Sequence, residues 1–129
     1  MESFSNAKRQ GSGTQMAKKI LIVEDDNNSR ESLRKILLQS GHAVEAAWSA
    51  EEAKSKLAGY TPDVALLDVR LPGMPGDALG IYLQNKFPGV KIIFISGDFY
   101  AETSSRFGPN VQAFPKPIDV EKLLEAIEQ

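Results

Sequence analysis

Acidic, hydroxyl and basic side chains stand at the ends of short apolar runs, where together they could carry out phosphoryl transfer. The set comprises Glu24, Asp25, Asp68, Ser96 and Lys116. Two carboxylates about 4 Å apart repel by roughly 4 kcal/mol at an effective dielectric of about 20, so three gathered acids favour a bound divalent cation. Mg²⁺ or Mn²⁺ suits such a site, because both ions prefer oxygen ligands. A carboxylate can then act as nucleophile and form an acyl phosphate.

The position of each side chain suggests its role. Asp68 is predicted to be the nucleophile, because it stands alone at the end of the central apolar run. Glu24 and Asp25 are predicted to hold the metal, while Lys116 and Ser96 contact the phosphoryl oxygens. Two simpler explanations stay open at this point. Asp68 could merely end a strand, and Asp26, which follows Asp25, could interact favourably with the dipole at the start of a helix.

The elements that position these residues alternate between strand and helix patterns. Continuous apolar runs at residues 20–23 and 64–67 predict parallel strands covered on both faces. Further strands are predicted at residues 43–47, which alternate in part and favour a place nearer an edge, at 91–96 and, as a short strand, at 111–114. Helices are predicted after the capping residues Asn28, Ser49, Asp77 and Asp119, whereas residues 99–110 favour at most a short or frayed fourth helix. The pattern indicates an α/β fold, a (βα)5 doubly wound parallel sheet, whose right-handed crossovers bring all strand ends to one edge.

Size and composition predict one ordinary globular domain. The chain has 129 residues, of which 1–17 are expected to form a flexible tail or linker and 18–129 the domain. The formal net charge of −2 argues against nucleic acid and anionic membranes as partners. The chain contains no cysteine, which excludes disulfides and thiolate chemistry. With no apolar run of membrane-spanning length and no signal pattern, a cytoplasmic location is expected.

Two further residues receive structural interpretations. His42, the single histidine of the sequence, is predicted to lie at the start of a strand rather than to bind a metal or act in catalysis. Trp48 is predicted to be a packed loop side chain rather than a platform for a ligand.

Four motifs, each at the end of a predicted strand, resemble the receiver domain of two-component response regulators. The motifs span residues 22–26, 66–74, 95–97 and 115–117. The resemblance extends from about residue 19 to residue 129. It implies a flavodoxin-like sheet of strand order 2-1-3-4-5.

The resemblance also implies a phosphorelay function. Asp68 would accept a phosphoryl group from a histidine kinase or a histidine phosphotransfer protein, and the signal would pass to a downstream protein target. The metal ligands would be Glu24, Asp25, Asp68 and the backbone carbonyl of Arg70. A cis bond between Lys116 and Pro117 would orient the ammonium. The protein would assist its own phosphorylation and dephosphorylation rather than act as an enzyme on another substrate.

Two features depart from the usual receiver pattern. The aromatic switch residue that normally stands three positions before the lysine is replaced by Ala113, with Phe114 one position later. The stretch from Ser96 to Lys116 is short at the expense of the fourth helix, so the switch region, which comprises Ser96, Gly97, Ala113 and Phe114, is expected to differ from the usual one.

The positions that vary between receivers are Arg70 and Asp98 in this sequence. We hypothesise that these two residues form an ion pair across the mouth of the site and limit the access of water to the phosphoryl group. A double-mutant cycle on the dephosphorylation rate tests the pair.

Residues 99–110 are expected to be the most mobile part of the fold. Their mobility is expected to decrease when a metal ion and a phosphoryl mimic bind. The chain is expected to lack an output domain, or else to be the receiver of a hybrid kinase.

Competing functions are a receiver-like interaction module that works without phosphorylation, an aspartyl-phosphate phosphatase and a flavin or nucleotide binder. Arg70 argues against the phosphatase, which would need a second acid at this position. The three acids at residues 24–26 argue against a flavin or nucleotide binder, which would need a glycine- or hydroxyl-rich loop there.

Overall fold

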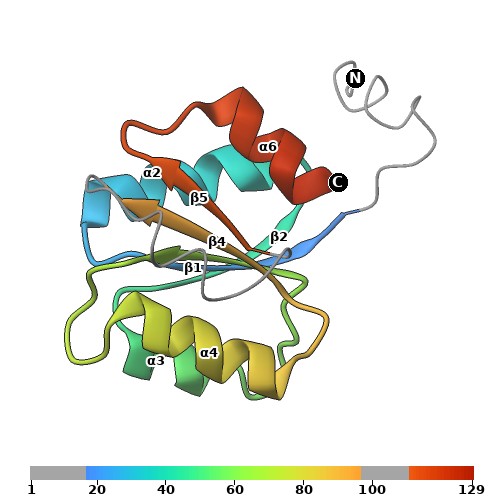
Figure 1. Ribbon diagram of the computed structural model, residues 1–129. Helices are drawn as coiled ribbons and strands as arrows, with labels where there is room; N and C mark the ends of the chain where they lie inside the picture. The colour runs from blue at the N-terminus through green and yellow to red at the C-terminus, as the bar shows by residue number, and fades with distance from the viewer. Residues whose placement is uncertain (1–16, 97–110) are drawn as a thin grey trace.

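The computed structural model describes residues 17–96 and 111–129 (Figure 1). Strands and helices alternate along this part of the chain, apart from the expected fourth helix, whose residues lie outside it. The elements are β1 (Lys19–Val23), α2 (Asn27–Gln39), β2 (Ala43–Ala47), α3 (Ala50–Lys56), β3 (Val64–Asp68), α4 (Gly76–Lys86), β4 (Lys91–Ser96), β5 (Val111–Pro115) and α6 (Val120–Glu128).

The five strands form one parallel sheet in the order β2-β1-β3-β4-β5, which confirms the flavodoxin-like order that the resemblance implies. In this register Val23 at the end of β1 pairs with Leu67, and Asp68 pairs with Ile95 of β4. The carboxyl ends of β1 and β3 therefore lie next to each other, and the residues that follow them meet at the same edge.

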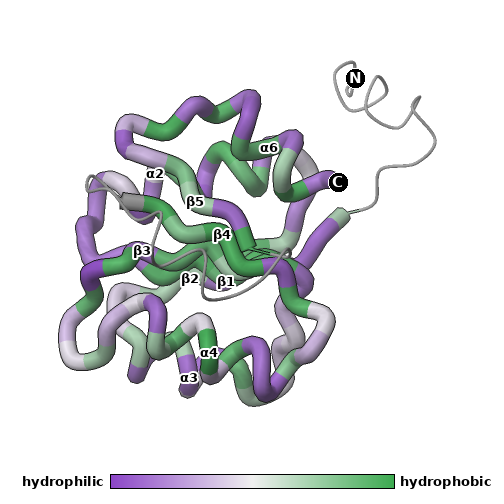
Figure 2. Tube along the Cα trace, viewed as in Figure 1, coloured by the Kyte–Doolittle hydropathy of each residue, from purple (hydrophilic) through white to green (hydrophobic). Residues whose placement is uncertain are grey.

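Helices cover both faces of the sheet, α2 and α6 on one side and α3 and α4 on the other (Figure 1). Each strand divides its side chains between the two layers: Leu21 and Val23 pack with the α3 and α4 side, while Ile20 and Ile22 pack with the α2 and α6 side. Figure 2 shows the hydrophobic stretches gathered in the sheet between these layers. Burial on both faces is why the central parts of β1, β3 and β4 are continuously apolar, whereas the edge strands β2 and β5 contain Glu45 and Gln112.

The helix starts correct two of the four predicted caps. Ser49 and Asp119 accept hydrogen bonds from the backbone N–H groups of Glu52 and Lys122, as capping residues do. Helix α2, however, begins at Asn27 with Asp26 as its cap, so the prediction of Asn28 was wrong.

Helix α4 begins at Gly76, directly after Pro75, which provides no side-chain cap. Asp77, predicted to be the cap, instead lies inside the first turn, where its carboxylate accepts a hydrogen bond from Ala78 N at 2.9 Å. Pro75 can take this place because its fixed φ suits the entrance to a helix.

The predicted position of His42 at the start of a strand is confirmed, whereas the prediction of a packed Trp48 is wrong. His42 is buried just before β2; its Nδ1 accepts from Lys18 N at 3.0 Å and its Nε2 lies 3.1 Å from Glu128 Oε2. Trp48 is 52% exposed instead of packed, because the loop between β2 and α3 turns it outward. Among the described residues, no helix combines the length and apolar character needed to cross a bilayer.

Candidate functional site

The acid-rich loop after β1 places one carboxylate inside the fold and another at its surface. Glu24 continues the strand, since its N–H donates to Ala47 O at 3.0 Å, and its side chain is buried. The Glu24 Oε2 atom accepts a hydrogen bond from Asp26 N at 3.1 Å. Asp25 is exposed at the rim. The roles of three consecutive acids are thus divided between the site, its rim and a helix cap.

The cap explanation for Asp26 is the one that the structure supports. Its carboxylate accepts from Ser29 N at 2.8 Å, and this hydrogen bond is the main cause that lowers the pKa of Asp26. Asp26 therefore stabilises the start of α2 as an anion, at the end of the helix where the dipole favours negative charge.

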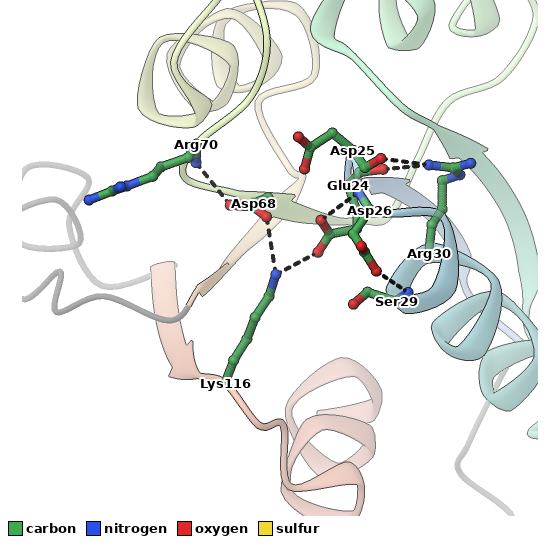
Figure 3. A network of polar contacts seen from close by, with 8 residues as sticks. All are labelled: Glu24, Asp25, Asp26, Ser29, Arg30, Asp68, Arg70 and Lys116. Carbon is green, nitrogen blue, oxygen red and sulfur yellow. Dashed lines mark hydrogen bonds and ion pairs between the residues drawn. The ribbon is translucent and has the colours of Figure 1, made fainter.

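Asp68 is the last residue of β3 and is 7% exposed, at the edge where it meets the acidic loop (Figure 3). Its Oδ1 atom accepts from Arg70 N at 2.9 Å. One oxygen from each of Glu24, Asp25 and Asp68 lies within 4.8 Å of the others. The convergence that the parallel topology predicts is therefore present.

Lys116 reaches this acid group from the loop after β5. Its Nζ donates to Glu24 Oε1 at 2.8 Å and to Asp68 Oδ2 at 3.2 Å (Figure 3). The peptide bond between Lys116 and Pro117 is cis, as predicted. The lysine thus bridges the two buried carboxylates, which come from neighbouring strands.

The electrostatics of this group favour a cation. Burial raises the pKa of Glu24 above its ordinary value, and Asp68 adds to the rise, while hydrogen bonds from Lys116 and Asp26 N oppose it. Burial would by itself lower the pKa of Lys116, but its hydrogen bonds to Glu24 and Asp68 outweigh burial and raise that pKa. The lysine therefore stays protonated, yet one ammonium faces three carboxylates.

The donor set fits a hard divalent ion. Glu24, Asp25 and Asp68 offer carboxylate oxygens only, the ligands that Mg²⁺ and Mn²⁺ prefer, and the exposed rim at Asp25 leaves room for bound water. These three residues would hold the ion. The carbonyl of Arg70 stays a predicted ligand.

The remaining predicted site residues fall partly outside the described chain. Ser96 ends β4 beside Pro115, but its side chain is not among those described. Gly97 and Asp98 lie outside the described residues, as does the expected mobile segment 99–110, so the ion pair between Arg70 and Asp98 stays a hypothesis.

The two residues of the altered switch point to opposite faces of the sheet. Ala113 packs against the layer of α3 and α4, whereas Phe114 packs against the layer of α2 and α6. Neighbouring residues of a strand alternate in this way. The ring of Phe114 therefore does not substitute for an aromatic side chain at position 113.

Two residues next to the site were missed by sequence reasoning. Arg30 of α2 donates hydrogen bonds to the backbone of the acidic loop, at Glu24 O and Asp25 O. Gly76 at the start of α4 lies against the backbone of Asp68. A basic residue in the first turns of the helix after an acidic loop, and a glycine at a helix start, were the available signals.

Comparisons with known proteins agree with this site. The sequence pattern of the response regulator receiver domain matches residues 20–128. The DNA-binding transcriptional regulator NtrC of Salmonella typhimurium is 30% identical over 85% of this chain and 24% of its own length. The response regulator MprA of Mycobacterium bovis is 32% identical over 84% of this chain and 48% of its own length. The chain thus spans about a quarter of the length of the first relative and about half of the second.

Solved structures give the same result. A CheY-like receiver domain protein from Methanospirillum hungatei JF-1 superposes with a TM-score of 0.78 at 34% identity, over 87% of this chain and 91% of that one. The receiver domain of NtrX from Brucella abortus has a TM-score of 0.74 at 28% identity, over 85% and 98% of the two chains. With five parallel strands in the receiver order and an acid–lysine site at their carboxyl ends, this chain belongs to the response regulator receiver domain family.

Proposed function

We propose that Asp68 accepts a phosphoryl group from a phosphohistidine on a partner histidine kinase or histidine phosphotransfer protein. The observation that carries the proposal is the position of the Asp68 carboxylate, within reach of Glu24 and Asp25 and hydrogen-bonded to the Lys116 ammonium. A bound Mg²⁺ or Mn²⁺ would offset negative charge on the phosphoryl oxygens. The arrangement suits transfer by positioning and electrostatics, which is how phosphoryl transfer is usually catalysed.

In the proposed step, an Asp68 carboxylate oxygen attacks phosphorus and the bond from phosphorus to the imidazole nitrogen breaks. The electron pair of that bond stays on the imidazole, and the product is an acyl phosphate on Asp68. Arg70 N orients the carboxylate through its hydrogen bond to Oδ1. Lys116 can exchange its contact with Asp68 for one with a phosphoryl oxygen while it remains bound to Glu24. Ser96 would donate to another phosphoryl oxygen.

A groove beside the site supports a protein as the phosphoryl donor. It runs between α2 and the loop before α6 and is mainly apolar, with Leu33 and Ile36 on one wall and Pro117 and Ile118 on the other. Lys116 itself belongs to the lining. A partner protein bound in this groove would therefore lie next to Lys116 and could reach the carboxylate of Asp68 from the rim of the groove.

Phosphorylation would add a charge of about −1.5 to −2 at Asp68 and alter the surface that a downstream protein recognises. In this proposal the domain is a phosphoacceptor that assists its own phosphorylation and dephosphorylation, without acting as an enzyme on a separate substrate. Neither nucleic acid nor a membrane is a partner in it.

A second candidate is an interaction module of the same fold that works without phosphorylation. It is favoured by the absence of an aromatic side chain at Ala113, because the ring of Phe114 packs on the opposite face of the sheet. Binding of a downstream partner with equal affinity before and after phosphorylation would favour this candidate.

Intact-mass spectrometry after incubation with acetyl phosphate and MgCl₂ tests the primary proposal. We expect one phosphoryl adduct on the wild type and none on Asp68→Asn. Asp77→Asn is the matched control, because its carboxylate lies in the first turn of α4 and outside the acid group, and it should be labelled like the wild type. An unlabelled wild type, or equal labelling of Asp68→Asn, would overturn the assignment.

A further inference from the structure

We propose that Arg30 is a positioning residue for the metal-binding acids, an inference that rests on the proposed function. Its guanidinium donates hydrogen bonds to the backbone carbonyl oxygens of these residues (Figure 3). The Nη1 atom donates to Glu24 O at 2.9 Å and, more weakly, to Asp25 O at 3.4 Å. These are the two residues that supply ligands from the end of β1.

The carbonyl groups of Glu24 and Asp25 lie beyond the last fully paired residue of β1, although the N–H of Glu24 still donates to Ala47 O. That last residue is Val23, which is paired with both neighbouring strands. The same guanidinium donates through Nη2 to the side-chain oxygen of Asn27, the first residue of α2. A planar guanidinium can bridge several acceptors at once, so Arg30 ties the strand end to the helix start.

Arg30 and Lys116 lie on opposite sides of the acidic loop (Figure 3). Lys116 binds the carboxylate of Glu24, whereas Arg30 binds the carbonyl of the same residue. With its carbonyl held from the helix side, the Glu24 side chain is directed toward Asp68. The position of both ligands therefore depends on a residue that does not itself touch the ion site.

The charge of Arg30 and the hydrogen bonds that it donates would act in opposite directions on the affinity for a bound cation. A positive charge near the site repels Mg²⁺, so removing the charge alone would tighten binding. Loss of the backbone hydrogen bonds would loosen the ligands and weaken binding; changes to groups that orient metal ligands typically cost about 10–100-fold in affinity. The sign of the change separates the two effects.

The test is a titration of the full chain with MgCl₂ at constant ionic strength, followed by amide chemical shifts in ¹H–¹⁵N spectra. We expect Arg30→Gln to weaken Mg²⁺ binding by about tenfold. Arg30→Lys should fall between it and the wild type, because an ammonium cannot bridge the same acceptors. Arg34→Gln is the matched control: it removes the same charge one turn along α2, where the arginine pairs with Glu31 in an exposed position. It should change the affinity by less than about twofold, because solvent and salt screen it.

Binding by Arg30→Gln that equals or exceeds that of the wild type would overturn the inference, even if thermal melting showed a loss of stability. An equal weakening in Arg34→Gln would also overturn it. Failure of the wild type to bind Mg²⁺ would instead overturn the proposed metal site and the inference with it. Because the spectra report folding directly, the titration is done at a temperature where each variant gives the native pattern of amide signals.

Discussion

Gly76 lies directly against the backbone of Asp68. A Cβ atom added at position 76 would come within 2.8 Å of Val69 Cα and closer still to the carbonyl oxygen of Asp68. The N–H of Gly76 also donates to Val69 O at 2.8 Å, so the start of α4 is held against the end of β3. The predicted phosphoacceptor therefore depends on a residue without a side chain.

We expect Gly76→Ala to destabilise the fold by about 1–3 kcal/mol, the usual cost of overpacking, because the contacting atoms are backbone that cannot turn aside. A helical glycine without such a contact would gain about 0.5–1 kcal/mol from alanine, so the sign is diagnostic. Urea denaturation measures it. Gly89→Ala, where nothing lies within 4 Å, is the control and should stay within about 0.5 kcal/mol of the wild type. A gain in stability for Gly76→Ala would show that α4 moves away freely.

Replacing Lys116 with methionine should destabilise the protein by about 2 kcal/mol at neutral pH without divalent ions, because two buried carboxylates lose their shared ammonium. Burial already raises the pKa of Glu24 in the folded state. The penalty should therefore shrink as the pH falls through that raised pKa and the carboxylate takes up a proton.

Adding MgCl₂ should restore part of the stability of Lys116→Met, since an ion that binds only the folded acids stabilises the fold. Urea denaturation with and without MgCl₂ measures both effects. Lys122→Met, a change on the exposed surface of α6, serves as the control. Equal losses in the two variants would mean that the ion pairs of Lys116 contribute no stability.

The hydroxyl of Tyr60 should lose its proton at a higher pH than an ordinary tyrosine does. This hydroxyl donates to Ile20 O at 2.9 Å, and burial raises its pKa from the usual 10.0 to about 12. Because the folded-state pKa is the higher one, its contribution to stability is complete below about pH 10 and disappears as the pH approaches about 12. Absorbance titration of tyrosinate should show a late transition in the wild type and in Tyr82→Phe that is missing from Tyr60→Phe. Retention of that transition in Tyr60→Phe would refute the assignment.

The buried contact between His42 and Glu128 should stabilise the end of the sheet away from the acids. Since His42 Nδ1 accepts from Lys18 N, its Nε2 carries the proton that faces Glu128. We expect His42→Leu to cost about 2 kcal/mol, because it leaves a buried N–H and a buried carboxylate without this partner. Glu128→Gln keeps an acceptor and should cost less. A change below about 0.5 kcal/mol in His42→Leu, measured by urea denaturation, would contradict this.

Much of the fold was predictable because the relevant signals are local. The apolar runs of β1, β3 and β4 cannot be solvated on either face, so they require a sheet covered on both sides. The caps Ser49 and Asp119 were recognisable from their spacing. Asn28 was mistaken for a cap because Asp26 and Asn28 are both residue types that cap helices, and only the structure shows that Asp26 accepts the hydrogen bond, from Ser29 N.

The sequence by itself determined which residues meet at the sheet edge, because parallel strands with right-handed crossovers deliver Glu24, Asp68 and Lys116 to one side. Only the tertiary structure decided the different roles of the three consecutive acids: Glu24 is buried against Lys116, Asp25 is exposed at the rim and Asp26 caps a helix. It also decided that Arg30 holds a carbonyl and that Gly76 must lack a side chain. Both contacts involve backbone atoms of another element, and a residue's type alone does not indicate which backbone it will meet.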